Sequence, residues 1–164
     1  MMTKLQIKDS LVTSLFGGFL GTIAMDVVNY VSWKTKTSEM TYGHLAGSIM
    51  VKGLRTHKKT NFLLGQILHM ITGASFGIPV FYILKHTGTK HHLFKGAFSG
   101  LLTWGILYDF GQRVRLFSAI NHRTSSHYSF LINNIIYGMV TAESIISFTD
   151  KSILKNKESE NQMA

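Results

Sequence analysis

Four long and almost uncharged apolar stretches dominate this sequence of 164 residues, and shorter segments rich in Lys and Arg separate them. The stretches cover residues 11–33, 61–84, 93–112 and 130–149. Each approaches the roughly 20 residues with which an α-helix crosses the hydrocarbon core of a bilayer. We therefore expect an all-α polytopic membrane protein built as a four-transmembrane-helix bundle.

The third stretch is the weakest of the four, because Lys95 and Asp109 shorten its uncharged part. A lysine near a helix end can extend its ammonium group to the headgroup region, which keeps the crossing feasible. The alternative is three crossings and one helix that lies at the interface. Pro79, the only proline, falls inside the second stretch, where neighbouring helices can satisfy the carbonyl that it frees.

Residues 1–150 are expected to form a single transmembrane domain, and the polar residues 151–164 a disordered tail. The first loop, residues 38–51, places Tyr42, Leu45 and Ile49 at helical spacing just before a basic run. This pattern predicts a short helix at the membrane interface. A re-entrant segment that lines a pore is the alternative reading.

The net charge of +9 lies mostly in Lys/Arg clusters at the ends of the apolar stretches, as expected of membrane-flanking loops. A nucleic-acid-binding protein would carry such a charge on a folded surface instead, so no nucleic-acid partner is expected. The two sides of a four-crossing protein would carry nearly equal numbers of Lys and Arg, which leaves the orientation open. The absence of cysteine excludes disulfides, thiolate nucleophiles and Cys-ligated metal sites.

Small residues recur four positions apart in every apolar stretch. Lipid provides no hydrophobic drive between helices, so their association depends on backbones that approach closely, which this spacing permits. The residues predicted to allow such packing are Gly17, Gly21, Gly73, Gly77, Gly96, Gly100, Gly138 and Ala142.

Ionisable residues inside the apolar stretches give the best indication of a functional site, because a charge within the bilayer needs a partner or water. Asp26, His69 and Asp109 fall at similar depths on the side of the first loop. Glu143 lies on another face of its helix and is expected outside this site. The predicted binding site comprises Asp26, Asn29, Gln66, His69, Asp109, Asn133, Asn134 and Tyr137.

Binding or passage of a small ion, proton or polar solute is the function that this polar layer favours, since an Asp–His pair suits proton handling. Three other interpretations remain open. The layer can be structural, with Asp26 hydrogen-bonded to His69 and Asp109 paired with Arg113. The chain can be an accessory or scaffold subunit.

A metal site is the third interpretation, because carboxylates and imidazole suit zinc, iron or manganese. Its candidate ligands are Asp26, His69 and Asp109, with His122 or His127. It would make the chain a metal-dependent intramembrane enzyme. We expect no other cofactor, assign no catalytic residue and favour a non-enzymatic role.

Several apolar strings resemble those of small four-helix bacterial inner-membrane proteins of the YagU-like kind. They are Gly18–Asp26, Leu64–His69 followed by Gly73 and Phe76-Gly77, and Ile136-Tyr137-Gly138. The resemblance covers three helices and implies the four-helix architecture and a bacterial cytoplasmic membrane, with no activity attached. The expected partners are the lipid bilayer and a second copy of the chain or another membrane protein.

Overall fold

The computed structural model describes residues 6–51, 58–118 and 123–154. This part of the chain is helical and contains no strand, although Ile7 and Thr149 form an isolated bridge. The prediction of an all-α protein is confirmed. The helices are α1 (Ser10–Lys34), α2 (Tyr42–Met50), α3 (Lys59–Thr87), α4 (His92–Thr103), η2 (Trp104–Phe110), α5 (Gly111–Arg113), α6 (Thr124–Phe148) and α7 (Lys151–Leu154).

Three of these helices, α1, α3 and α6, are long and apolar enough to cross a membrane. Their outer faces expose large apolar side chains such as Val27, Ile71 and Ile132, each more than half exposed. A water-soluble protein rarely exposes so continuous an apolar surface. The membrane-protein class predicted from the sequence is thus supported by length, composition and exposed surface together.

The third predicted stretch is one continuous helical path in three pieces. The backbone stays in the right-handed helical region at Thr103, Trp104, Phe110 and Gly111, where α4, η2 and α5 join. The middle piece, η2, is a π-helix of seven residues. A π-helix bonds each residue to the fifth along the chain, so side chains after Trp104 depart from α-helical positions.

Helix α6 begins at Thr124, earlier than the predicted residue 130. The carboxylate of Glu39 accepts a hydrogen bond of 2.9 Å from the backbone N–H of Arg123. The same carboxylate accepts a bond of 3.3 Å from the Ser126 hydroxyl. An anionic acceptor stabilises a helix N-terminus, which explains why polar residues 124–129 join the helix.

The C-terminal tail departs from the predicted disorder at its start, because Lys151–Leu154 form α7. Leu154 is buried in an apolar cluster with Leu84 and Ile145, and Ile153 packs against the same cluster, so apolar side chains anchor this turn. The rest of the predicted tail, residues 155–164, lies outside the described residues.

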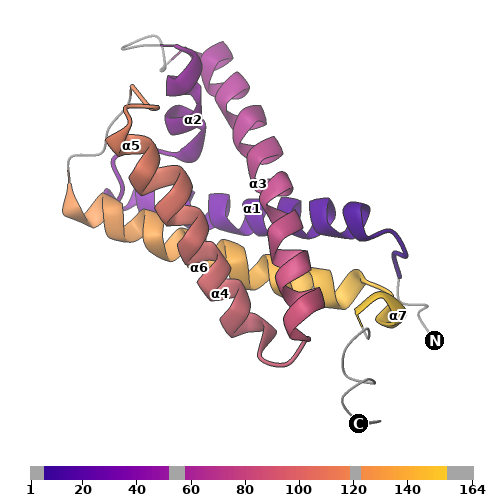
Figure 1. Cartoon of the computed structure of the whole chain (residues 1–164). Helices are drawn as coiled ribbons and strands as arrows, with labels where there is room; N and C mark the ends of the chain where they lie inside the picture. The colour runs from indigo at the N-terminus through magenta and orange to yellow at the C-terminus, as the bar shows by residue number, and fades with distance from the viewer. Residues whose placement is uncertain (1–5, 52–57, 119–122, 155–164) are drawn as a thin grey trace.

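The four rods pack in the spatial order α3, α1, α6, α4. Helices α1 and α6 lie side by side, α3 packs across α1, and α4 packs across α6. Figure 1 shows that α3 and α4 approach each other at their connecting loop and diverge toward α2 and α5. The ends of α3 and α4 nearest α2 are therefore held by α1, α6 and α2 rather than by each other.

The seams between these helices are lined by glycines, both the predicted ones and Gly18, which the prediction did not include. A Cβ on Gly18 of α1 would lie 2.5 Å from the backbone oxygen of Ala74 in α3. A Cβ on Gly96 of α4 would collide with the backbone oxygen of Gly138 in α6. Because the obstacles are backbone atoms, no side-chain adjustment could relieve such collisions, and only glycine fits.

Helix α2 closes the end of the molecule where α3 and α4 diverge. Its Gly43 and Gly47 lie against Gly65 of α3. Its first N–H, at Tyr42, donates a 3.1 Å hydrogen bond to Oδ1 of Asn29 in α1. At its other end the Ser118 hydroxyl donates to the carbonyl of Ser48 at 2.7 Å. The short helix is thus fixed at both ends and along one face.

Candidate binding cavity

A cavity of about 250 Å³ lies where α3 and η2 diverge beneath α2. Helix α3 contributes residues around its own midpoint, α6 forms the floor with Asn134 and Tyr137, and α2 forms the roof. Its walls are mostly apolar. The lining residues are Met25, Tyr42, Leu45, Ala46, Ile49, Leu68, His69, Thr72, Gly73, Phe76, Thr103, Leu107, Tyr108, Leu116, Phe117, Asn134 and Tyr137.

Polar groups gather at the wall formed by α2 and α6. The Asn134 side-chain amide donates to the Tyr42 hydroxyl at 3.0 Å and to the Phe130 carbonyl at 2.8 Å. The Tyr137 hydroxyl donates to the Gly73 carbonyl at 2.6 Å, which links α6 to α3. Burial raises the pKa of the Tyr42 hydroxyl well above its ordinary value, so this group remains a protonated donor.

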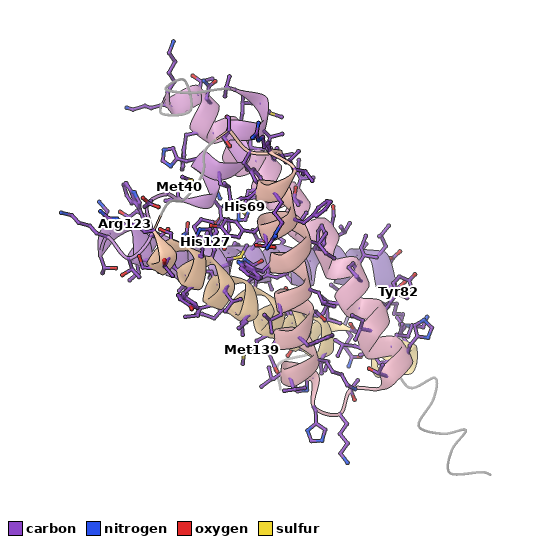
Figure 2. All side chains as sticks on the ribbon, turned by 60° about the vertical axis from the view of Figure 1, so that its left-hand side comes forward. Met40, His69, Tyr82, Arg123, His127 and Met139 are labelled. Atoms are coloured by element: carbon purple, nitrogen blue, oxygen red, sulfur yellow. The ribbon has the colours of Figure 1, made fainter. Side chains whose placement is uncertain are left out.

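His69 connects this cavity to the seam between α1 and α3. Its ring stacks on Tyr42, with centroids 4.6 Å apart and planes only 2° from parallel. Its Nε2 lies 3.1 Å from Oδ1 of Asp26, an ion-pair distance at which the ring is not aligned for a hydrogen bond. Figure 2 shows His69 among the helices, whereas Tyr82, farther along α3, points outward.

Asp26 itself faces the opposite side of the seam. Its Oδ2 accepts a 2.5 Å hydrogen bond from the Gln66 side-chain amide. Both residues line a shallow groove between α1 and α3 that also contains Tyr30 and Met70. The predicted trio of Asp26, Gln66 and His69 is therefore brought together, with only His69 reaching the cavity.

Asp109 lies apart from that trio. It belongs to η2 and accepts a 2.8 Å hydrogen bond from Nε of Arg113, and 41% of its side chain is exposed. The sequence predicts similar depths in the membrane for Asp109 and Asp26, but the two side chains do not face each other.

The remaining predicted site residues divide between the cavity and the α1–α6 seam. Asn134 and Tyr137 line the cavity, and Asn29 anchors its roof. Asn133 is buried and lines a separate groove with Val28 and Ser129. Glu143, which the sequence excludes from the site, lies 2.7 Å from Nε2 of His92.

The candidate metal ligands do not form one cluster in the described part of the chain, where no three His, Asp or Glu side chains converge as a metal site requires. His127 instead lies with its Nδ1 3.2 Å from the Tyr108 hydroxyl. His122 lies outside the described residues. The Asp26–His69 pair alone is too small a ligand set to hold zinc or iron.

Much of the cavity wall comes from residues that the sequence analysis did not select, chiefly the aromatic residues Tyr42, Phe76, Tyr108 and Phe117. Apolar and aromatic side chains are expected in any membrane helix, so periodicity alone could not assign them to a cavity. One signal was available: Gly43 and Gly47 have the same four-residue spacing as the other packing glycines, which indicates that α2 packs tightly on another helix.

No protein-family model matches this chain, and it has no significant match among curated proteins or solved structures. What the fold itself defines is an all-helical protein with three helices able to cross a membrane. A largely apolar cavity lies beside one of them.

Proposed function

We propose that the chain is a multi-pass protein with four crossings, in which α4, η2 and α5 together make the third. Large apolar side chains along this composite rod support the proposal, since Phe94, Phe98, Ile106 and Phe110 are 56–78% exposed. Such exposure is favourable in lipid and unfavourable in water. The YagU-like resemblance favours the cytoplasmic membrane of a bacterium as the location.

In this arrangement α2 lies at the membrane surface on the side of the first loop. Its buried face carries Tyr42 and Leu45, while Ile49 and Met50 near its end are 42% and 60% exposed. A helix with one face on the protein and an apolar edge outward suits the interfacial region. The basic run that follows it in sequence suits contact with lipid headgroups.

The protein's function, in this proposal, is to bind a small ligand that enters the cavity from the bilayer. The observation that carries it is the position of the cavity, which is lined by the middle of α3 and flanked by the partly exposed side chains of Leu68, Thr72 and Leu107. A concave, mostly apolar site with a few convergent polar groups is typical of ligand pockets. The apolar walls favour a ligand with an apolar body over the small ion predicted from the sequence.

The test fills the cavity while leaving Tyr42, His69 and Asn134 unchanged. In the variant Thr72→Phe, an aromatic ring would occupy the space now lined by Thr72. The matched control is Ser75→Phe, which makes the same addition on the exposed face of the same helix. Thr72 and Ser75 each bond to the carbonyl four residues earlier, at 2.8 and 2.9 Å, so both substitutions remove an equivalent bond.

Each protein would be purified from its membrane into nanodiscs, and bound compounds would be extracted and identified by mass spectrometry. We expect a compound enriched with the unsubstituted protein and with Ser75→Phe, and lost with Thr72→Phe. Equal recovery from all three proteins would contradict the proposal.

A further inference from the structure

The charge of the cavity wall limits what can bind there. Among the described residues that line the cavity, none is Lys, Arg, Asp or Glu. Asp26, the nearest acidic partner of His69, lies behind that histidine in the outer groove. A fatty-acid carboxylate or a phosphate would enter this site without a compensating charge, at a high desolvation cost. The site therefore favours an uncharged ligand.

The wall is also aromatic on several sides, through Tyr42, Phe76, Tyr108, Phe117 and Tyr137. Tyr108 is itself held in place by Phe130, with ring centroids 4.7 Å apart and planes 16° from parallel. Rings fixed in this way present flat surfaces or edges to a neighbour, and a planar ring packs best against them.

The cavity groups that can donate to a ligand gather at one end, because the hydroxyls of Thr72 and Thr103 bond to carbonyls of their own helices and that of Tyr108 lies 3.2 Å from His127. Tyr42, His69 and Asn134 meet there.

The Tyr42 hydroxyl, whose bond to the Phe130 carbonyl is long at 3.4 Å, and the His69 imidazole can donate to an oxygen atom. The Asn134 amide uses both of its hydrogens on Tyr42 and Phe130 and holds the Tyr42 hydroxyl in place. A ligand that carries a carbonyl oxygen on a planar ring would match this end. The Asp26 carboxylate, 3.1 Å from Nε2 of His69, acts as a positioning group for the ring.

The volume sets a further limit. Cavities for whole drug-sized ligands measure roughly 300–1,000 Å³, and this one measures about 250 Å³. It holds a head group, and any longer apolar chain would have to leave through the flank at Leu68, Thr72 and Leu107. That flank would lie against acyl chains.

We propose that the cavity binds the ring of a neutral, lipid-soluble carbonyl compound of the quinone class, with its apolar chain extending into the bilayer. This inference rests on the proposed function, since it names the class of ligand for the same cavity. Tyr42 and His69 bind the ring carbonyl, Asn134 positions the Tyr42 hydroxyl, and the aromatic wall holds the ring plane.

The chain offers a built-in reporter for the test. It contains two tryptophans, and Trp104 packs beside Tyr108 of the cavity wall with ring centroids 6.1 Å apart. Trp33→Phe removes the other, at the exposed end of α1. Decylubiquinone, a short-chain quinone that quenches tryptophan fluorescence, would be titrated into nanodiscs that hold this single-tryptophan protein. The control probe is 1-decanol, which has a similar apolar chain but lacks the ring.

We expect saturable quenching of Trp104 by decylubiquinone and none by 1-decanol. Thr72→Phe should remove the saturable part, and Ser75→Phe should retain it. His69→Leu should weaken the apparent affinity about tenfold, the effect of losing one good hydrogen bond. His86→Leu, at an exposed position farther along α3, should leave the affinity unchanged.

Quenching that rises linearly with quinone, and equally in Thr72→Phe and Ser75→Phe, would overturn the inference. If the mass-spectrometry test still found a compound that Thr72→Phe loses, the cavity would remain a ligand site for another class of molecule. If that test also failed, the proposed function would fall with the inference.

Discussion

Helix α3 meets its neighbours in two different ways. Against α1 it packs backbone to backbone, where Gly73 and Gly77 face Gly18 and the residues beside it. Toward α4 and η2 it presents Leu68, Thr72 and Phe76 instead, and a cavity separates the two walls. Helix α4 mirrors this arrangement, since its Gly96 and Gly100 face α6.

The difference shows that the glycine faces also determine where the open space lies. Each of α3 and α4 uses its glycine face on an inner helix, α1 or α6, so their larger side chains are left to face one another. Lipid provides no hydrophobic drive between helices, so these two faces of α3 and α4 do not pack tightly against each other. The cavity is a consequence of how the glycines are distributed.

The largest expected effect comes from breaking a closed seam. Gly18→Leu would place a side chain against the backbone of Gly73 and Ala74, where a Cβ would lie 2.7 and 2.5 Å from their oxygens. We expect the free energy of unfolding to fall by about 1–3 kcal/mol, the typical cost of overpacking a well-packed interior. Thermal unfolding in nanodiscs would measure it.

Gly105→Leu is the matched control, because nothing lies within 4 Å of a Cβ added to Gly105 in η2. The unfolding temperature should change little. If Gly18→Leu were as stable as Gly105→Leu, the close contact between α1 and α3 would be wrong.

A smaller effect is expected on the open side. Tyr42→Phe would remove the hydroxyl that accepts from Asn134 while keeping the ring that stacks on His69. We expect a loss of about 1 kcal/mol, the typical value of one hydrogen bond. Tyr82→Phe, on the exposed face of α3, should show no loss in the same unfolding measurement, and an equal loss in both would contradict the role given to Tyr42.

Substitutions in the two acidic pairs, Asp26 with Gln66 and Asp109 with Arg113, should have the smallest effects on stability. Asp26→Asn would replace a charged acceptor for Gln66 with a neutral one, at a cost below about 1 kcal/mol. Asp109→Asn would break an exposed pair with Arg113 and should leave the unfolding temperature unchanged. A larger effect of Asp109→Asn than of Asp26→Asn would reverse the assignment of the two carboxylates.

Helical depth and spacing were sufficient to predict the inner contacts of the site. The expected pairing of Asp109 with Arg113 is present, and Asp26 lies 3.1 Å from Nε2 of His69 without the hydrogen bond that the sequence predicts. Both contacts follow from the 3.6-residue period and the antiparallel order of neighbouring helices, which the sequence displays directly.

Other features depend on tertiary packing and could not be read from the sequence. Depth alone placed Asp109 at the level of Asp26, but its direction depends on the packing of α4 against α6 and on the π-helix in η2. The early start of α6 depends on Glu39, which lies far from Arg123 in sequence. The cavity is defined by a space between helices, which no residue type marks.

Photolabelling would show whether the space between α3 and η2 is a ligand site open to the bilayer. A photoreactive short-chain quinone in nanodiscs should label residues of α2, α3 and η2 that line the cavity, such as Ala46, Leu68 and Leu107. Thr72→Phe should abolish that labelling, and Ser75→Phe should preserve it. Labels spread over the outer faces of α1 and α4 at positions such as Val27 and Phe94, and unchanged by Thr72→Phe, would contradict the proposed ligand site.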